Sequence, residues 1–331
     1  STFQTNPIDL HRLLDECHRG LIQLPDFQRS WVWDEDRIKS LIASISRAFP
    51  VGALMSLDTG GPVNFKPRPV EGAPAEARQT APQSLLLDGQ QRMTSLYQVT
   101  LRGKVVETVT PKKKRVKRWF YLDIAKAIDE SVDREEAVIG VPEDRVERTD
   151  FGREIALDLS TPAKEYAALM FPVSQVFDWD TWQDGFNDHW SGEEHKAVRE
   201  QFRTFKKEVL ENFKMYRVPV IALDRSTSKE AVCVVFEKVN TGGKALDAFE
   251  LVTAMYAASG HELRKDWYGD EGVKGRHQRL ADTLRPADSN AGILAGVGNT
   301  DFLQAISLFF TRDRRRAAEQ AGKEGKELPA V

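Results

Sequence analysis

The sequence has few cysteines, no long apolar run and almost no net charge, and each of these features excludes a class of protein. Cys17 and Cys233 are too few for a disulfide framework and lack the spacing of a zinc site, so we expect both to be reduced core residues. No segment approaches the roughly 18 consecutive apolar residues of a membrane-spanning helix, and the N-terminus lacks the pattern of a signal peptide. These absences favour a cytoplasmic protein with no membrane partner.

The sequence also lacks a large excess of charge of either sign. The 47 Lys and Arg residues are offset by 50 Asp and Glu residues, which leaves a formal net charge of -3. Such a chain has no overall field that attracts nucleic acid or an anionic membrane. Any contact with DNA must therefore come from a local patch, for which Lys113, Lys114 and Arg115 in the run KKKRVKR (112–118) are candidates. A simpler interpretation of this run is a basic strand edge beside a hairpin.

The composition is that of a folded protein, because 41% of the 331 residues are hydrophobic and 29% are charged. A chain of this length has room for one large domain or two ordinary ones. We expect an α+β core over residues 1–140 and a mainly helical region over residues 141–313. Residues 314–331 are polar and lack an apolar face, which is typical of a linker. We therefore expect the natural protein to continue into a further domain.

The order of the predicted elements favours an α+β fold over a regular alternation of strands and helices. The clearest element is an amphipathic helix that Asp34 caps and whose apolar residues run from Ile38 to Phe49 at helical spacing. Pro50 is expected to end this helix. Periodicity and breaker residues predict the other early elements, namely a helix over 7–19, strands over 21–27, 51–57 and 84–88, and a surface loop over 58–83.

The stretch LLLDGQQRMTSLYQ (85–98) passes from a buried strand directly into a helix. Asp88 is the expected N-cap, Gly89 permits a tight turn, and Gln91 follows the cap at capping-box spacing. Backbone N–H groups at such a helix start form an anion site, to which Arg92 would add a cation suited to phosphate. The alternative is a purely structural capping box with a salt bridge to Arg92. Against it, two glutamines and an arginine at a core-adjacent turn need partners.

Two further stretches strengthen the case for a binding site. LPDFQRSWVW (24–33) leaves a strand into a polar turn, and VNTGGKAL (239–246) is the expected hinge of a helical hairpin, with flexible glycines, an amide, a hydroxyl and a lysine. The first stretch offers side chains that suit bonding to, or stacking on, a base or sugar phosphate: Phe27, Gln28, Arg29 and Trp31. The structural alternative is that Phe27 lies in the core and that Gln28 and Arg29 pair with the neighbouring helix.

Together the three stretches form a signature. They resemble the N-terminal domain of the GmrSD family of modification-dependent (type IV) restriction proteins, whose members show Pro-x-Phe/Tyr-Gln-Arg, Asp-Gly-Gln-Gln-Arg and Asn-Thr-Gly-Gly segments in this order. The matching segments span residues 24–252, about two thirds of the chain. The resemblance implies a ParB/sulfiredoxin-like α+β core followed by helices, with Asp-Gly-Gln-Gln-Arg at a site that binds and hydrolyses a nucleotide.

The resemblance also implies roles for single residues. Asp88 would orient a water molecule or Mg²⁺, and Asp88 and Arg92 would act in the hydrolysis of an NTP, either GTP or ATP. The residues expected to hold the nucleotide are Gly89, Gln90, Gln91, Arg29, Asn240, Thr241 and Lys244. Phe27 and Gln28 could instead contact DNA as part of a sensing pocket, and the sequence leaves both roles open.

Members of this family commonly couple such a domain to a His-Asn-His (HNH) nuclease, and relatives sense modified DNA. The implied partners are therefore modified double-stranded DNA and an HNH-type nuclease domain, either tethered or separate, while a homodimer is left open. The six histidines of the chain show no His-x-x-Pro pattern of that nuclease. We therefore expect no nuclease activity from this chain alone.

Three functions compete at this point. The first is a nucleotide-binding and nucleotide-hydrolysing regulatory domain of a restriction protein. The second is a non-catalytic module that binds modified DNA, which the basic run 112–118 and the arginines near residue 314 favour. The third is a ParB-like nuclease, which needs a cluster of metal-binding carboxylates for which Asp88 and Asp123 are the candidates.

Overall fold

The computed structural model divides the chain into two compact units. The first consists of Ser1–Pro62 with Pro67–Thr227, and the second of Val63–Lys66 with Ser228–Val331. The first unit extends past the boundary expected at residue 140, because later aromatic residues join the same hydrophobic core. The described residues are 3–26, 28, 31, 33–110, 112–150, 153–228, 231–232, 235, 248–257, 261–270, 272–283 and 292–323.

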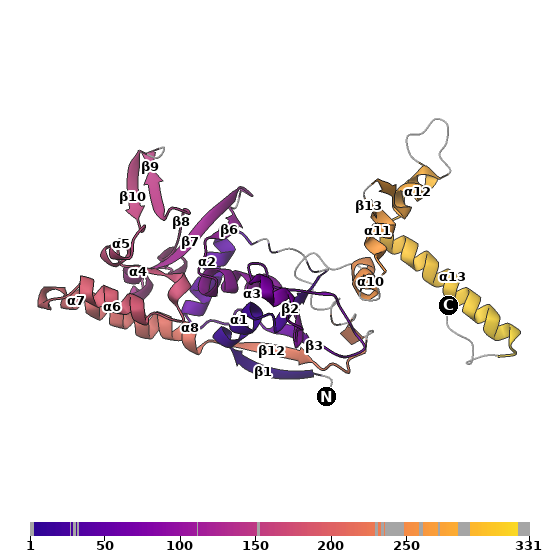
Figure 1. Cartoon of the computed structure of the whole chain (residues 1–331), viewed down its shortest axis with the longest axis horizontal. Coiled ribbons are helices and arrows are strands. Elements are labelled where there is room, and N and C mark those ends of the chain that lie inside the picture. The colour runs from indigo at the N-terminus through magenta and orange to yellow at the C-terminus, as the bar shows by residue number, and fades with distance from the viewer. Residues whose placement is uncertain are drawn as a thin grey trace. The chain divides into compact units, whose positions relative to one another are not determined.

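A six-stranded mixed sheet forms part of the first unit (Figure 1). Its strands, in spatial order, are β1 (Phe3–Asp9), β12 (Arg217–Leu223), β3 (Leu54–Asp58), β5 (Ser84–Asp88), β2 (Ile22–Pro25) and β4 (Pro67–Arg68). β12 is parallel to β3 and β2 is parallel to β5, whereas the other neighbouring pairs are antiparallel. Helices and mixed strands in one core confirm the α+β class, while a ParB-like core stays a prediction.

The first helix begins later than its sequence pattern indicates. Residues 7–9 belong to β1, where Pro7 lies opposite Pro219 of β12. Helix α1 then covers Leu10–His18 and buries its apolar face. The predicted start at residue 7 was wrong because the strand that pairs with these residues lies about 210 positions further along the chain, out of reach of any local pattern.

Helix α2 (Glu35–Ser46) confirms the predicted amphipathic helix and its cap. The Asp34 side chain accepts a hydrogen bond from the backbone N–H of Arg37 at 2.9 Å, which satisfies one of the free donors at the helix start. The helix ends at Ser46, and Phe49 lies beyond it with a side chain that is 53% exposed. The apolar stripe therefore stops about one turn earlier than predicted.

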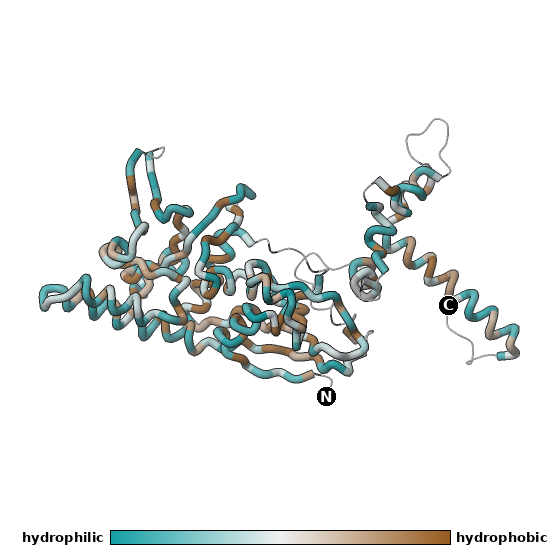
Figure 2. The backbone as a smooth tube through the Cα atoms, in the orientation of Figure 1, coloured by the Kyte–Doolittle hydropathy of each residue, from teal (hydrophilic) through white to brown (hydrophobic). Residues whose placement is uncertain are grey.

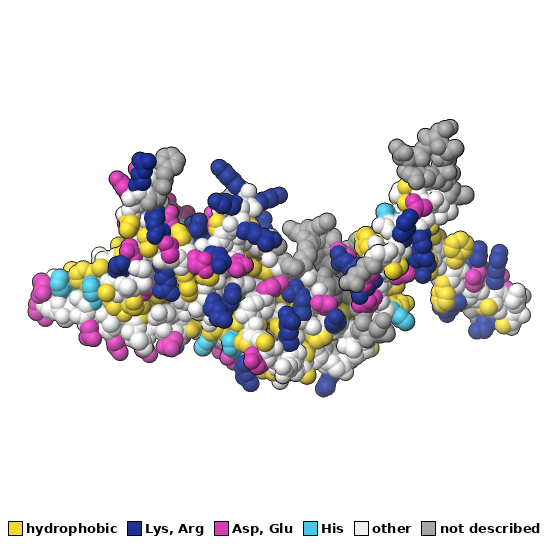
Figure 3. Space-filling model, turned by 45° about the horizontal axis from the view of Figure 1, so that its top comes forward, with side chains coloured by type: hydrophobic (Ala, Val, Ile, Leu, Met, Phe, Trp, Pro, Cys, Tyr) yellow, Lys and Arg dark blue, Asp and Glu magenta, His cyan; other side chains and the backbone are white. Residues whose placement is uncertain are grey.

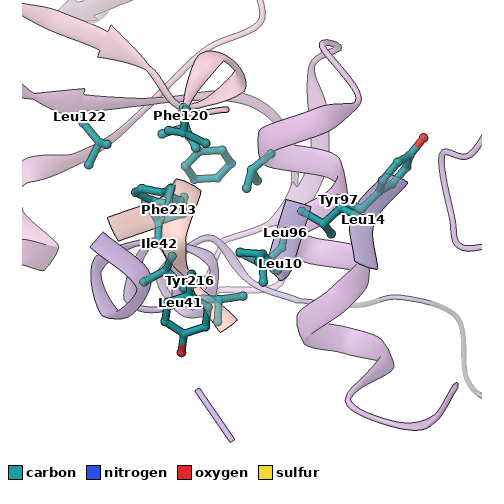
Figure 4. Close-up of a cluster of buried hydrophobic side chains, with 14 of the residues drawn as sticks. Leu10, Leu14, Leu41, Ile42, Leu96, Tyr97, Phe120, Leu122, Phe213 and Tyr216 are labelled. Carbon is teal, nitrogen blue, oxygen red and sulfur yellow. The ribbon is translucent and has the colours of Figure 1, made fainter. Parts of the chain in front are cut away.

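These helices and α3 (Gln90–Leu96) share one hydrophobic core with the sheets (Figure 4). Its labelled members are Leu10, Leu14, Leu41, Ile42, Leu96, Tyr97, Phe120, Leu122, Phe213 and Tyr216. Cys17 is a free, buried thiol of this core, as predicted, and burial raises its pKa to about 12. Such a thiol stays protonated and unreactive at neutral pH. Cys233 lies outside the described residues.

The first unit also holds a four-stranded antiparallel sheet and a separate hairpin. The sheet consists of β6 (Val106–Val109), β7 (Arg115–Asp123), β8 (Val138–Val141) and β11 (Met170–Pro172), and the hairpin of β9 (Val146–Thr149) and β10 (Glu154–Asp158). The basic run 112–118 forms the turn between β6 and β7 and the first half of β7. It is a basic strand within a hairpin, as the simpler interpretation held.

The remaining α-helices of the first unit include one, α5, that carries a buried carboxylate. The α-helices are α4 (Ile124–Ile128), α5 (Pro162–Ala167), α6 (Asp180–His189), α7 (Lys196–Phe205) and α8 (Glu211–Met215). Most of α7 is hydrophilic (Figure 2). Glu165 of α5 is 2% exposed and accepts hydrogen bonds from the Tyr121 hydroxyl at 2.9 Å and from Trp182 Nε1 at 3.0 Å. Arg145 Nη1 lies 3.4 Å from the same carboxylate. This network joins α5 to β7 and α6.

The second unit is mainly helical in its described part. It contains α10 (Ala248–Ala257), α11 (Leu263–Tyr268), the short strands β13 (Gly269–Asp270) and β14 (Val273–Lys274), α12 (Arg276–Asp282) and α13 (Asn299–Gln320). Residues 314–320 are helical and continue α13, and a linker over residues 314–331 stays a prediction. Within the described part of the chain, no helix is long and apolar enough to cross a membrane.

We expect Glu165→Ala to lower the free energy of unfolding by about 3 kcal/mol, because it leaves buried donors without their acceptor. Glu165→Gln keeps one acceptor oxygen and should cost less. Burial raises the folded-state pKa of Glu165 above its unfolded value, so its contribution to stability is greatest below the unfolded pKa and falls as pH rises through the folded pKa. Urea denaturation at several pH values measures both effects.

Glu147→Ala is the control, because Glu147 is an exposed glutamate on β9. Its free energy of unfolding should change by less than about 0.5 kcal/mol. A loss equally small for Glu165→Ala would show that the buried network contributes nothing to stability.

Candidate functional site

The Asp-Gly-Gln-Gln-Arg segment lies where β5 ends and α3 begins. Gly89, and not Asp88, is the N-cap of α3, and it takes the left-handed conformation with φ of 85°. The capping role predicted for Asp88 was wrong, because no described side chain caps this helix end. The left-handed turn redirects the chain within one residue, so that Asp88 and Arg92 come to lie on the same side of the junction.

Arg92 joins three parts of the first unit. Its Nη1 donates to the carbonyl oxygen of Val51, and its Nη2 donates to that of Ala53 at 2.9 Å and lies 3.5 Å from Asp88 Oδ2. The Arg92 side chain is 20% exposed and that of Asp88 is 35% exposed. The guanidinium thus fixes the segment before β3 against the start of α3. The Asp88 carboxylate stays partly open to solvent.

Two glycines make room for this arrangement. A Cβ atom on Gly52 would lie 2.6 Å from Arg92 Nη1, and one on Gly89 would lie 2.2 Å from Cδ2 of Leu54. Both glycines have positive φ values, which side chains disfavour in any case. Any other residue at position 52 or 89 would therefore displace the guanidinium or strand β3.

Gln28 approaches the junction from the end of β2. It is 7% exposed, and its Nε2 donates to the carbonyl oxygen of Leu87 at 2.8 Å. Its Oε1 is buried and has no hydrogen-bond partner among the described residues. An unsatisfied buried acceptor costs free energy and is found where a ligand or water completes the contact. The bond to Leu87 pairs Gln28 with strand β5. The structural alternative had expected Gln28 to pair with the neighbouring helix.

The other predicted residues are placed as follows. Gln90 and Gln91 are partly buried in the first turn of α3, next to Asp88. Lys113, Lys114 and Arg115 are exposed at the tip of the β6–β7 hairpin, where Figure 3 shows basic side chains gathered. The remaining ones lie outside the described residues: Phe27, Arg29, Asn240, Thr241 and Lys244. Of the residues predicted to act together, the structure joins Asp88 to Arg92 and places Gln28 against Leu87, directly before them.

The carboxylates that could hold a metal ion are few. Asp123 accepts a hydrogen bond from the Lys126 backbone N–H at 3.0 Å and caps α4. Among the described residues, no group of three or more His, Cys, Asp or Glu side chains could hold a metal. A single carboxylate such as Asp88 suits Mg²⁺, which commonly takes one or two protein carboxylates and completes its shell with waters and substrate phosphates.

Sequence reasoning missed the carbonyl groups that hold Arg92. Val51 and Ala53 carry no side-chain chemistry, and backbone acceptors cannot be read from residue types. The available signal was Gly52 between them, directly after Pro50. A glycine at the start of a predicted strand often marks a close approach by another group.

The chain thus combines an α+β core with polar motifs at the ends of its strands. A family model described as the GmrSD restriction endonuclease N-terminal domain matches residues 10–257. The chain belongs to this family, which confirms the resemblance read from its three motifs.

A relative extends the comparison without adding a function. The chain is 26% identical over 272 residues to an uncharacterized protein of Methanocaldococcus jannaschii. The matched region covers 78% of this chain and 43% of that protein, so the chain spans less than half of the relative's length.

We expect Gly89→Ala to lower the free energy of unfolding by about 2 to 4 kcal/mol. The left-handed backbone contributes about 1 kcal/mol of this loss and the contact with Leu54 the rest. Gly103→Ala is the matched control, since Gly103 also has a positive φ but meets nothing within 4 Å of its added Cβ. Urea denaturation compares the two, and equal losses would show that the close packing against Leu54 is unimportant.

Proposed function

We propose that this chain is a nucleotide-binding and nucleotide-hydrolysing regulatory domain of a modification-dependent restriction protein. Membership of the restriction family supports the general class. The observation that carries the finer proposal is the β5–α3 junction, where Arg92 is fixed beside partly exposed Asp88, and where Gln28, whose Oε1 is unsatisfied, bonds to the carbonyl oxygen of the preceding residue, Leu87. A rigid cluster of polar groups with unused acceptors is what a ligand site requires.

Each residue of the junction has a distinct part in this proposal. Asp88 orients the attacking water, and water adds across the terminal P–O bond of GTP or ATP to give NDP and inorganic phosphate. Mg²⁺, which Asp88 would hold, neutralises phosphate charge when it is bound. Gly89, Gln90 and Gln91 present N–H groups to the phosphates. Asn240, Thr241, Lys244 and Arg29 stay predicted members of the site.

The contacts of Arg92 change the role expected for it. A guanidinium has five N–H donors, and three contacts with Val51, Ala53 and Asp88 already occupy its Nη atoms. Arg92 is therefore first a positioning residue, and only its remaining donors are available for phosphate. Replacement of Arg92 by alanine would also leave two carbonyl groups without their donor, so loss of activity in that variant would not separate chemistry from folding.

Asp88→Asn is the sharper test. It keeps the size of the side chain and removes the charge that orients water and holds Mg²⁺, so phosphate release from GTP or ATP should fall by at least about 100-fold. Release is measured on the whole chain with magnesium, with and without modified DNA. The proposal also expects modified DNA to change the rate, since a regulatory domain must respond to its signal.

The chain offers a matched control for this substitution. Asp15 of α1 and Arg19, which follows that helix, form an exposed pair with the same spacing in sequence and the same 3.5 Å separation as Asp88 and Arg92. Asp15→Asn should therefore leave phosphate release unchanged. Failure of the wild-type protein to bind or hydrolyse any NTP, with its fold intact, would overturn the proposal.

A second candidate function is binding of modified double-stranded DNA, and the β6–β7 hairpin favours it. Lys113 and Lys114 project at the turn, where Lys113 takes a left-handed conformation with φ of 61°. Exposed cations at a protruding tip suit contacts with phosphates along a duplex.

A nuclease of the HNH type, cytoplasmic location and a homodimer stay predictions. The described carboxylates give a ParB-like nuclease no support.

Replacing Lys113, Lys114 and Arg115 together by alanine should weaken DNA binding and flatten its salt dependence. The slope of log K against log salt should fall by about 0.9 for each DNA phosphate that the protein no longer neutralises. Fluorescence anisotropy over a range of salt concentrations measures this slope. Replacement of Lys196, Arg203 and Lys207 of the α7 region removes the same charge elsewhere and should leave it unchanged; equal effects of the two triple substitutions would exclude the hairpin as the contact.

A further inference from the structure

A pocket of about 900 Å³ opens in the first unit, and among its lining residues only Trp31 and Arg115 have been given a role above. Its described lining comes from the segment before α2, from the loop after β4, from the end of the α3 region, from the β6–β7 hairpin and from Glu143. The residues that characterise it are Trp31, Trp33, Glu71, Gln98, Arg102 and Arg115. Its volume falls within the range of small-ligand sites.

Two tryptophans form fixed walls of this pocket. Both pack against the hydrophobic core on one side and line the pocket on the other. Trp31 Nε1 donates to Ser95 Oγ at 2.9 Å, and Thr108 Oγ1 donates to the carbonyl oxygen of Trp33 at 2.6 Å. The first bond holds the Trp31 ring and the second the Trp33 backbone, while packing against the core supports both rings, which offer surfaces on which a flat ring can stack.

A carboxylate oxygen in the pocket wall lacks a donor among the described residues. Glu71 Oε1 accepts hydrogen bonds from the Trp31 backbone N–H at 3.0 Å and from Arg68 Nη1 at 2.9 Å. Glu71 Oε2 is buried, and no described residue donates a hydrogen bond to it. The side chain is therefore fixed through one oxygen, and the other can accept a hydrogen bond from a ligand N–H group.

Cations at the rim complete the arrangement. Arg102 donates to Gln98 Oε1 at 2.9 Å and lies over Gly72, where a Cβ would approach Arg102 Cδ to 2.9 Å. Arg115 is exposed and forms no ion pair with any described residue. In contrast, Lys117 of the same hairpin pairs with Glu143 at 2.9 Å. Arg102 and Arg115 thus carry positive charge that no described carboxylate pairs with, which suits a phosphate at the mouth of the pocket.

We propose that this pocket receives an unpaired nucleobase of a DNA strand, with its ring against Trp31 or Trp33 and an exocyclic amino group donating to Glu71 Oε2. A carboxylate that accepts from the amino group of cytosine is an established form of base recognition. The DNA strand is favoured over a free nucleotide because the rim continues into the basic tip of the hairpin at Lys113 and Lys114. This inference rests on the DNA-sensing part of the proposed function and names what the protein reads.

The test compares duplexes that differ at a single unpaired base. One carries a bulged cytosine, a second a bulged deoxyuridine, which has a carbonyl oxygen in place of the amino group, and a third is fully paired. Fluorescence anisotropy with the whole chain should show the cytosine bulge bound about tenfold more tightly than the other two. The assay contains neither NTP nor magnesium, so absence of NTP hydrolysis would leave its result standing, and the reverse also holds.

Glu71→Gln should reverse the preference for cytosine over deoxyuridine. The amide keeps an oxygen for Trp31 and Arg68 and places an NH₂ donor where Oε2 was, which suits a carbonyl. Glu143→Gln is the matched control, because it removes the same charge from the pocket rim and should keep the cytosine preference. Trp33→Leu should weaken binding of both bulged duplexes by about tenfold, because it removes a stacking surface.

Three results would overturn the proposal. The first is equal binding of the bulged and fully paired duplexes by the wild-type protein. The second is a cytosine preference that a folded Glu71→Gln variant retains. If that variant does not fold, the corresponding result is that Trp33→Leu leaves the binding of bulged duplexes unchanged. The third is binding of free dCMP as tight as that of the bulged duplex, which would assign the pocket to a free nucleotide.

Discussion

The guanidinium of Arg92 is the contact on which the rest of the site depends. It draws the backbone carbonyls of Val51 and Ala53 and the carboxylate of Asp88 to one point. Hydrogen bonds to a charged group in a partly buried place are stronger than neutral ones, and removal of any of them leaves an acceptor without its donor. The end of β5, the start of α3 and the approach to β3 are therefore held in one geometry, and Gly52 and Gly89 are required because that geometry leaves no space for a Cβ.

Helix α3 connects this junction to the tryptophan-lined pocket. Ser95 Oγ donates to the carbonyl oxygen of Gln91 at 2.8 Å and accepts from Trp31 Nε1 at 2.9 Å. Gln98 and Arg102 follow on the same face at helical spacing and reach the pocket. A shift of Trp31 on binding of a base would therefore act directly on the first turn of α3. One short helix would then link recognition of DNA to the state of the nucleotide site.

The elements with strong local signals were predicted correctly from the sequence. The cap at Asp34, the short strand SLLLD and the helix that follows it all have local causes, namely a capping side chain, a run of leucines and helical periodicity. The start of α1 was missed because β12 pairs with residues 7–9 from far along the chain. Phe49 was placed on the wrong side of a helix end, since the backbone stops being helical three residues earlier.

The candidate site was predicted by residue type, and its internal contacts were not. Asp88 and Arg92 do come together, and Gln28 bonds to the neighbouring Leu87, yet Asp88 does not cap α3 and Arg92 binds backbone oxygens that no residue type reveals. Glu71, Gln98 and Arg102 gave no sequence signal, because they are ordinary polar residues whose importance arises only when the β6–β7 hairpin closes over them. Contacts between segments distant in sequence account for each of these gaps.

Hydrogen–deuterium exchange on the whole chain, with and without a non-hydrolysable NTP analogue and Mg²⁺, tests the central claim most directly. If the β5–α3 junction holds the phosphates, the amides of residues 89–92 should exchange more slowly when the analogue is bound, because their N–H groups gain acceptors. Protection confined to other segments, with exchange at 89–92 unchanged under saturating analogue, would contradict a nucleotide site at this junction.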